Sequence, residues 1–179
     1  MILSFSFTYR NHTVDADGLR DYIILHSKHN LLPEIQSESQ YFVPSNQPLD
    51  AIPQNIHHIF FCKYDYEVNV VQFPVNSVSQ LQSLTIKKEC FQNVREFAID
   101  GLERLESVKI GENCFRISDE ERNDGVCRIT NCPNLRQLEI GDNSFEYFKS
   151  FEISNLNSIQ SIKFGQRCFA YADFLLKGE

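Results

Sequence analysis

The sequence predicts a mainly β fold, a right-handed solenoid of about five coils with short strands on both sides, and three observations lead to this fold class. A phrase with apolar residues in the spacing of Leu-x-x-Leu-x-Ile, followed by four residues and Phe, occurs four times, first as LQSLTIKKECF from Leu81. A second short segment follows each copy and alternates between inward and outward positions, and glycine or asparagine recurs at fixed places between the segments. Self-similarity at a period of about 20–50 residues is typical of solenoids.

Each copy opens with a short strand on the first side of the coil. Its second and third apolar positions are two residues apart, which is the spacing of side chains on one face of a strand. The residue between these two positions must then point outward. The three apolar columns are Leu81, Leu105, Leu135 and Ile159; Leu84, Val108, Leu138 and Ile162; and Ile86, Ile110, Ile140 and Phe164.

The outward positions of these strands form a polar row. Adjacent parallel strands lie about 4.8 Å apart, so residues in the same column face one another from coil to coil. The row should be a ladder of alternating charge that helps to set the register. It consists of Thr85, Lys109, Glu139 and Lys163.

A second short strand is expected on the other side of each coil, at residues 97–99, 127–129, 151–153 and 174–176. Two residues beyond each of these segments come Gly101, Asn131, Asn155 and Gly178, which are residue types that tolerate a positive φ. They predict a tight, left-handed corner. Gly111, Gly141 and Gly165 mark another corner, directly after the first strand.

The copies begin at residues 81, 105, 135 and 159, so the intervals are 24, 30 and 24 residues. The longer interval predicts a six-residue insertion around residues 117–125. Insertions in solenoids loop out from one surface, often the binding surface, and functional residues concentrate on such loops. The alternative is a neutral loop, because lengthening a surface loop costs little.

A degenerate coil precedes the first clear copy. Ile56, Ile59 and Phe61 fit the three apolar columns 25 residues before Leu81, Leu84 and Ile86. Val71 and Phe73 fit the second strand of the same coil. The repeat region is therefore predicted to span residues 56–179.

Residues 1–55 do not repeat, and we expect them to form an irregular cap over the first coil, because an uncapped coil would expose its core and its strand edges. Residues 4–8 alternate like a strand, and a short helix is expected at residues 17–32, with Pro33 after it. Residues 34–55 are expected to be irregular. The alternative for this segment is an independent binding role.

The repeated phrase resembles a leucine-rich repeat and is most similar to the BspA-like class, over about residues 56–178. The resemblance implies protein–protein recognition or adhesion and specifies no ligand. The chain departs from the standard leucine-rich unit, which has one strand and a helical or irregular outer arc. Here the outer segment also alternates, so strands are expected on both sides.

Composition argues against several classes of function. The net charge is −7 and no cluster of Lys and Arg is present, which disfavours nucleic acids and anionic membranes as partners. No signal peptide and no apolar run of about 18 residues is evident, so a cytoplasmic location is expected.

The sequence offers no constellation for catalysis or metal binding, so we expect no enzyme activity and no cofactor. Most of the six cysteines occupy repeat columns, which favours packed free thiols over disulfides or a metal site. His57 and His58 are adjacent in an expected strand, so they face opposite sides and cannot chelate one ion together.

The expected function is that of a non-catalytic module that binds a protein partner through the polar strand face, the 116–125 loop, or both. The alternative is a structural or adhesive repeat protein that assembles end to end, with self-association through its C-terminal edge. The neighbouring outward position adds a second row beginning at Ser83. The candidate partner-binding residues are Thr85, Lys109, Glu139, Lys163, Ser107, Gln137, Ser161, Arg116, Asp119, Glu120, Glu121 and Arg122.

Overall fold

The structure is a computed structural model that describes residues 6–9, 12–15, 40–43, 49–53, 55–62, 70–73, 78–117 and 124–177. The chain divides into two compact units, residues 1–36 and 37–179. In the first unit, β1 (Ser6–Tyr9) and β2 (His12–Asp15) form an antiparallel hairpin. The helix expected at residues 17–32 lies outside the described residues.

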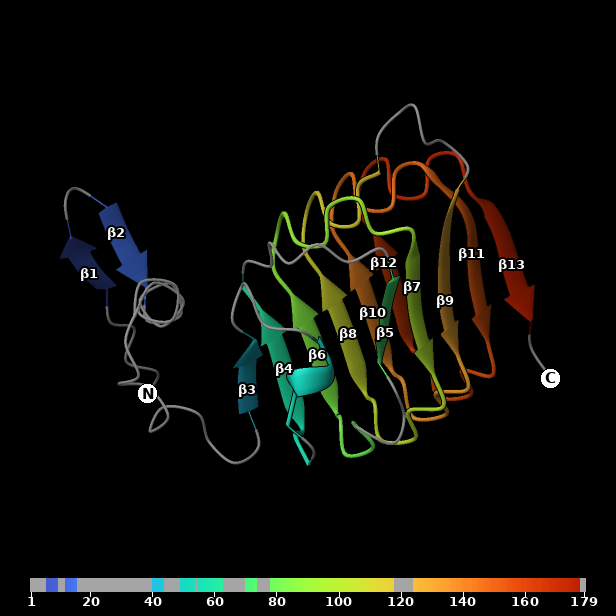
Figure 1. The fold of residues 1–179 in the computed structure, drawn as a ribbon, viewed down its shortest axis with the longest axis horizontal. Helices are drawn as coiled ribbons and strands as arrows, with labels where there is room; N and C mark the ends of the chain where they lie inside the picture. Colours follow the sequence, from blue (N-terminus) through green and yellow to red (C-terminus); the bar gives the residue numbers. More distant parts are fainter. Residues whose placement is uncertain are drawn as a thin grey trace. The chain divides into compact units, whose positions relative to one another are not determined.

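The second unit contains two parallel sheets, so the mainly β prediction is confirmed; apart from one short 3-10 turn, η1 (Leu49–Ala51), the described residues contain no helix. The larger sheet has six strands, in the order β12-β10-β8-β6-β4-β3 (Figure 1). They are β3 (Gln40–Val43), β4 (His58–Phe61), β6 (Ser83–Ile86), β8 (Ser107–Ile110), β10 (Gln137–Ile140) and β12 (Ser161–Phe164).

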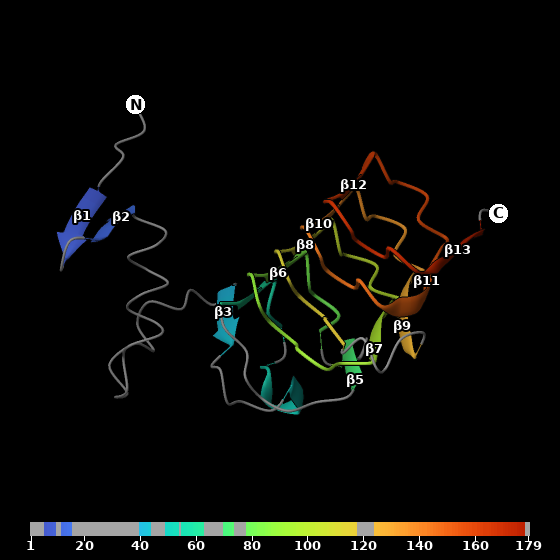
Figure 2. The same cartoon turned by 90° about the horizontal axis from the view of Figure 1, so that it is seen from above.

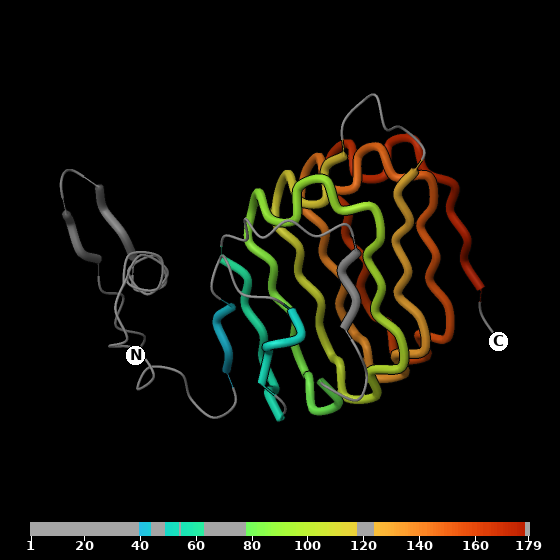
Figure 3. The backbone as a smooth tube through the Cα atoms, in the orientation of Figure 1, coloured from blue at the N-terminus to red at the C-terminus, as the bar shows by residue number. Residues whose placement is uncertain are grey.

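The smaller sheet has five strands, in the order β13-β11-β9-β7-β5. From β4 to β13, consecutive strands of the chain alternate between the two sheets, and the coloured stretches of the tube in Figure 3 follow this order. The five strands are β5 (Val70–Phe73), β7 (Glu96–Asp100), β9 (Gly125–Thr130), β11 (Phe148–Ser154) and β13 (Asp173–Lys177).

The strand pairing follows the sequence columns in both sheets. In the larger sheet Leu84 pairs with Ile59 on one side and with Val108 on the other, so Ile59 lies in the register that its column predicts. In the smaller sheet Phe97 pairs with Val71 and with Cys127. The prediction of strands on both sides of the repeat is therefore confirmed.

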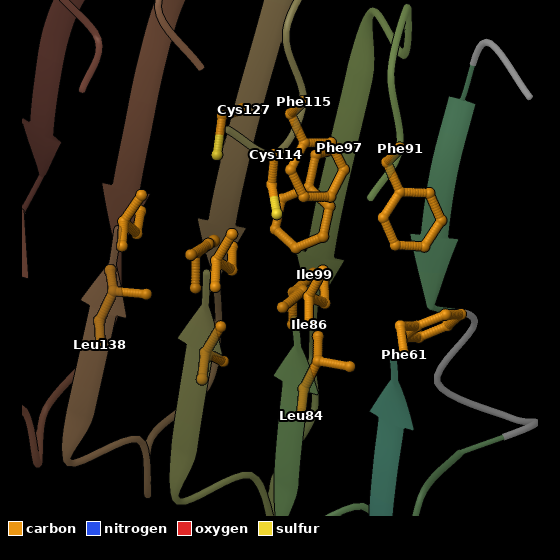
Figure 4. Close-up of a cluster of buried hydrophobic side chains, with 14 of the residues drawn as sticks. Phe61, Leu84, Ile86, Phe91, Phe97, Ile99, Cys114, Phe115, Cys127 and Leu138 are labelled. Carbon is orange, nitrogen blue, oxygen red and sulfur yellow. The ribbon is translucent and has the colours of Figure 1, made fainter. Parts of the chain in front are cut away.

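The two sheets lie opposite each other (Figure 2), and phenylalanine side chains fill the core between them. The phenylalanines that end the repeated phrase stack in a column: Phe115 lies 5.0 Å from Phe91 and 4.5 Å from Phe145, between ring centroids. Phe97 of β7 reaches Phe115 at 4.8 Å, and Figure 4 shows these rings with Leu84 and Ile86. Stacked pairs of this kind add about 0.5–1.5 kcal/mol each beyond their burial.

The corners after the second strands are left-handed, as predicted. Gly101, Asn131 and Asn155 have φ values of 71°, 53° and 54°, whereas Gly178 lies outside the described residues.

The glycines after the first strands are required for a different reason. A Cβ on Gly111 would lie 2.7 Å from the backbone nitrogen of Lys88, and one on Gly141 would lie 2.7 Å from the carbonyl carbon of Gly111. These glycines allow successive backbones to approach closely.

The prediction that residues 34–55 are irregular is wrong in part. β3 pairs in parallel with β4, and its Tyr41 and Val43 pair with Ile59 and Phe61. The larger sheet therefore begins at Gln40, and the second compact unit begins at Ser37. The segment lacks the repeated phrase, so only the short apolar run Tyr41-Phe42-Val43 could have indicated a strand.

The structure describes the two ends of the inserted segment. Ile117 is buried in the core, and Gly125 is the first residue of β9, where a Cβ would lie 2.6 Å from the ring of Phe148. Both residues are therefore part of the packed sheet structure and not of a surface loop. Residues 118–123 lie outside the described residues.

Candidate functional site

The outward face of the larger sheet carries the first predicted row of residues. Thr85 pairs with Lys109, Lys109 with Glu139, and Glu139 with Lys163. The Lys109 and Lys163 side chains are exposed, and those of Thr85 and Glu139 are half-buried. The strands β6, β8, β10 and β12 therefore place these four side chains in one line.

Charge alternates along this row as predicted. The Lys163 Nζ lies 3.1 Å from Glu139 Oε1, and the Lys109 Nζ lies 3.6 Å from Glu139 Oε2. The hydrogen bond and charge of Lys163, with the charge of Lys109, hold the pKa of the Glu139 carboxyl below its usual value. Exposed ion pairs of this kind contribute little to stability, so they can be exchanged for contacts with a partner.

The second predicted row runs beside the first and consists of uncharged polar side chains, three serines and Gln137. Ser83 pairs with Ser107, Ser107 with Gln137, and Gln137 with Ser161. The row continues onto β4, where His58 Nδ1 lies 2.8 Å from Ser83 Oγ. Short hydroxyl side chains lose little conformational entropy when they are immobilised, so this row is suited to close contact with another backbone.

Among the loop residues predicted to bind a partner, the structure describes only Arg116. Its guanidinium Nη2 lies 3.5 Å from Glu146 Oε2, so this arginine is engaged within the fold. Asp119, Glu120, Glu121 and Arg122 lie outside the described residues.

Glu146 is a buried charged side chain whose role the sequence analysis did not predict. Its carboxylate is buried, with 1% of the residue exposed, and it bridges Arg116 from one flanking coil and Arg167 from the other. The signal was weak but present: Arg116 and Glu146 both directly follow a buried phenylalanine of the repeat. Opposite charges in one column of adjacent coils indicate an ion pair between the coils.

A second charge ladder lies on the outward face of the smaller sheet. Arg128 Nη1 lies 3.3 Å from Glu96 Oε1, and Arg128 Nε lies 3.8 Å from Glu152 Oε2. Lys177 Nζ then lies 3.1 Å from Glu152 Oε1. The outward positions of residues 127–129 and 151–153 could have revealed this ladder, because they carry Arg128 and Glu152.

The small residues that directly precede the repeated phenylalanines form a column. The side chains of three of them, Cys114, Ser144 and Cys168, make a hydrogen-bonded ladder rather than a reactive site. The Cys114 Sγ donates to the carbonyl of Lys87 at 3.0 Å, the Ser144 Oγ to that of Gly111 at 2.8 Å, and the Cys168 Sγ to that of Gly141 at 2.9 Å. Burial raises the pKa of the Cys114 thiol to about 11. A thiol with a raised pKa is a poor nucleophile and a poor metal ligand.

All six cysteines lie within the described part of the chain, and each is a free thiol. Burial also raises the pKa of Cys132 to about 11 and that of Cys127 well above its ordinary value. His57 and His58 are both half-buried. Within the described ranges, no group of three or more His, Cys, Asp and Glu side chains is placed to hold a metal ion.

The far end of the two sheets exposes large apolar side chains, most of which belong to the core columns. These side chains lie on the last strands, β12 and β13, and in the turn between them. They are Ile162, Phe164, Tyr171, Phe174, Leu175 and Leu176.

Comparison with models of protein families, with curated proteins and with solved structures finds no match to this chain. The described residues include no helix of the length and apolar character that crossing a membrane requires.

Proposed function

We propose that this protein is a non-catalytic recognition module that binds a protein partner through the outward face of its six-stranded sheet. The observation that carries the proposal is the ordered pair of polar rows, one charged and one uncharged, on four neighbouring strands in register. A rigid sheet presents these groups without further ordering, which lowers the entropic cost of binding.

The fold that supports this role is proposed to be a right-handed solenoid of the leucine-rich-repeat type, similar to the BspA-like class. Its support is the alternation of consecutive strands between two parallel sheets and the in-register repeat columns. Solenoids typically present extended surfaces for protein recognition. We place this module in the cytoplasm, with neither nucleic acid nor membrane as a partner and without a cofactor.

The partner is expected to carry charges complementary to the sequence of Lys109, Glu139 and Lys163. Charge patterns of this kind fix the register of a complex and accelerate association. Residues 118–123 of the inserted loop, with Arg116 at its base, are proposed as a second contact region.

The test is affinity capture from native cell lysate combined with crosslinking mass spectrometry. The decisive variant carries Lys109→Glu, Glu139→Lys and Lys163→Glu, which preserves alternating charge within the ladder and reverses the pattern shown to a partner. The matched control is Arg104→Glu, which makes the same net change of charge at an exposed turn residue. A variant lacking residues 118–123 tests the loop.

The proposal predicts a protein that crosslinks to β8 or β10, is retained by the control and is lost with the reversed ladder. If every captured protein remains bound to the reversed ladder, the polar face is not the recognition surface. If capture depends on residues 118–123 alone, the loop is the site and the strand face is excluded.

A second candidate function is structural assembly, in which chains associate end to end. The apolar side chains exposed on β12 and β13 favour it, because large exposed apolar patches mark interaction surfaces. Oligomers that keep growing as the protein concentration rises would support this function over recognition of a different protein.

A further inference from the structure

The last strand of the smaller sheet has a sequence that is complementary to itself when it is reversed. β13 reads Asp173-Phe174-Leu175-Leu176-Lys177, with an acid at one end, a base at the other and three apolar residues between them. It ends the order of its sheet, so within the described part of the chain only β11 pairs with it (Figure 1). We infer that β13 pairs antiparallel with β13 of a second copy, across a two-fold axis at Leu175.

The chemistry of the strand selects this register. With Leu175 opposite its own counterpart, Phe174 faces Leu176 of the second copy, and Asp173 faces Lys177 of the second copy at both ends. Cross-strand neighbours in antiparallel pairs have Cβ atoms about 4.5–5.5 Å apart, where apolar and oppositely charged pairs are favourable. Centring the pair on Phe174 would instead set Asp173 against Leu175, and centring it on Leu176 would set Lys177 against Leu175.

The inferred register also keeps the inner and outward faces of the paired strands continuous with those of the rest of the sheet. Phe174 and Leu176 are in register with Phe151 and Ile153 of β11, so they lie on the inner face. Leu175 is in register with Glu152 and lies on the outward face with Asp173 and Lys177. Since faces alternate along a strand, the inferred register joins apolar to apolar inside and opposite charges outside.

β13 lacks several of the features that usually protect the edge of a sheet, although it carries Asp173 and Lys177 at its ends. Protected edges carry prolines, bulges or inward-pointing charges, whereas the inward positions here are Phe174 and Leu176, with 50% and 67% of their surface exposed. On the outward side, a leucine stands at 175, where the two preceding strands carry Arg128 and Glu152. Lys177 donates to Glu152, and its ammonium group has further donors for Asp173 of the second copy.

The neighbouring end of the larger sheet extends the same apolar surface. Phe164 of β12 lies 6.2 Å from Phe174, between ring centroids, and Ile162 is exposed beside it on the inner face of β12. A two-fold interface uses one patch on both copies and closes on itself, so it gives dimers and no filaments. The polar strand rows lie on other surfaces, and the inference does not depend on the proposed recognition function.

The test is the oligomeric state of the chain, measured by light scattering after size-exclusion chromatography and by sedimentation equilibrium. The expected mass is twice the 20.8 kDa of the single chain. Asp173→Lys and Lys177→Asp each place like charges opposite each other at both ends, so each should weaken dimerisation at least tenfold. Combining the two substitutions in one chain restores the pairing. Lys149→Asp, a similar reversal at an exposed position of β11, should have no effect.

Mixing the two single variants gives an independent result. The Asp173→Lys chain has a base at both ends of β13 and the Lys177→Asp chain has an acid at both ends. Each chain therefore repels its own copies and attracts the other variant, so the mixture should form heterodimers although neither variant dimerises alone. Circular dichroism and thermal melting check that each variant is folded. If one variant is not folded, hydrogen exchange in the wild-type protein tests the pairing instead. The β13 amides that point away from β11 should exchange slowly in the dimer, because their hydrogen bonds form only in the pair.

A wild-type chain that stays monomeric at every concentration overturns the inference, as do oligomers that grow without limit. A dimer that survives both single reversals, or that the double substitution fails to restore, places the interface elsewhere. A protein partner captured through the polar rows would be unaffected by any of these results, so the two proposals can fail separately.

Discussion

The middle and the end of the repeat carry the same sequence columns in opposite environments. Val108 and Ile110 of β8 are 1% and 2% exposed, whereas Ile162 and Phe164, in the same columns of β12, are 38% and 41% exposed. In the smaller sheet, Phe151 is 1% exposed and Phe174, its partner in register, is 50% exposed. The position of a side chain in its column therefore sets which face of the sheet it lies on. Whether the side chain is buried depends on a neighbouring strand on each side.

The largest expected difference concerns the phenylalanines. Phe115 is fully buried and stacks on Phe91 and Phe145, so Phe115→Ala should lower the free energy of unfolding by about 3–5 kcal/mol. Phe174→Ala, on the exposed strand, should cost less than about 1 kcal/mol. Urea unfolding of both variants at a protein concentration where the chain is monomeric measures the contrast. Equal losses would mean that the last strand is as well packed as the middle of the repeat.

A smaller difference is expected in the column of thiols and hydroxyls. Ser144 is buried, donates to the carbonyl of Gly111 and accepts from the backbone nitrogen of Cys114 at 3.0 Å. Ser144→Ala leaves both backbone groups without this partner and should cost about 1–3 kcal/mol. Cys168→Ala removes a single weaker donor at the half-buried end and should cost less. Ser144→Cys, which keeps a donor, is the matched control, and it should recover part of the loss measured by chemical unfolding.

The smallest effect is expected in the outward charge ladder, where Glu139 has a lysine on both sides and Lys163 ends the row. Lys163→Ala should raise the pKa of Glu139 toward its ordinary value, and Lys109→Ala should raise it less, because Lys163 is the larger cause of the depression. A depressed carboxyl pKa stabilises the fold above the unfolded pKa, and this contribution is lost as pH falls through the folded pKa. NMR titration of the Glu139 carboxyl measures the shift. An unchanged pKa in Lys163→Ala would contradict the 3.1 Å contact.

The sequence predicted those features of the fold that depend on local periodicity. Alternation fixes which side chains share a face, so the inner columns and the outward row of Lys109, Glu139 and Lys163 were predictable. β3 was missed, because residues 40–43 pair into the sheet without carrying the repeated phrase. The burial of Glu146 was missed as well, since it depends on Arg116 and Arg167, which are 30 and 21 residues away.

The candidate partner surface was only partly predictable for a related reason. The strand rows follow from the pleat, and the structure places them side by side. The second ladder, with Arg128 and Glu152, required a comparison of outward residues on the other side of each coil. Its presence means that charge complementarity alone does not distinguish one sheet face from the other, and that the reversed-ladder variant is needed to do so.

The stacked phenylalanines have one further property with consequences for how this sequence can change over time. Phe91, Phe115, Phe145 and Phe169 all have a positive φ, between 50° and 59°. Bulky residues rarely adopt that backbone, and β-branched residues are the least suited to it. Valine and isoleucine fill the strand columns well, yet they are poor replacements at these four positions. Substitutions among apolar residues are therefore tolerated better in the strands than at these four phenylalanine positions. If a repeat were duplicated, its phenylalanine is the residue we expect to change most slowly.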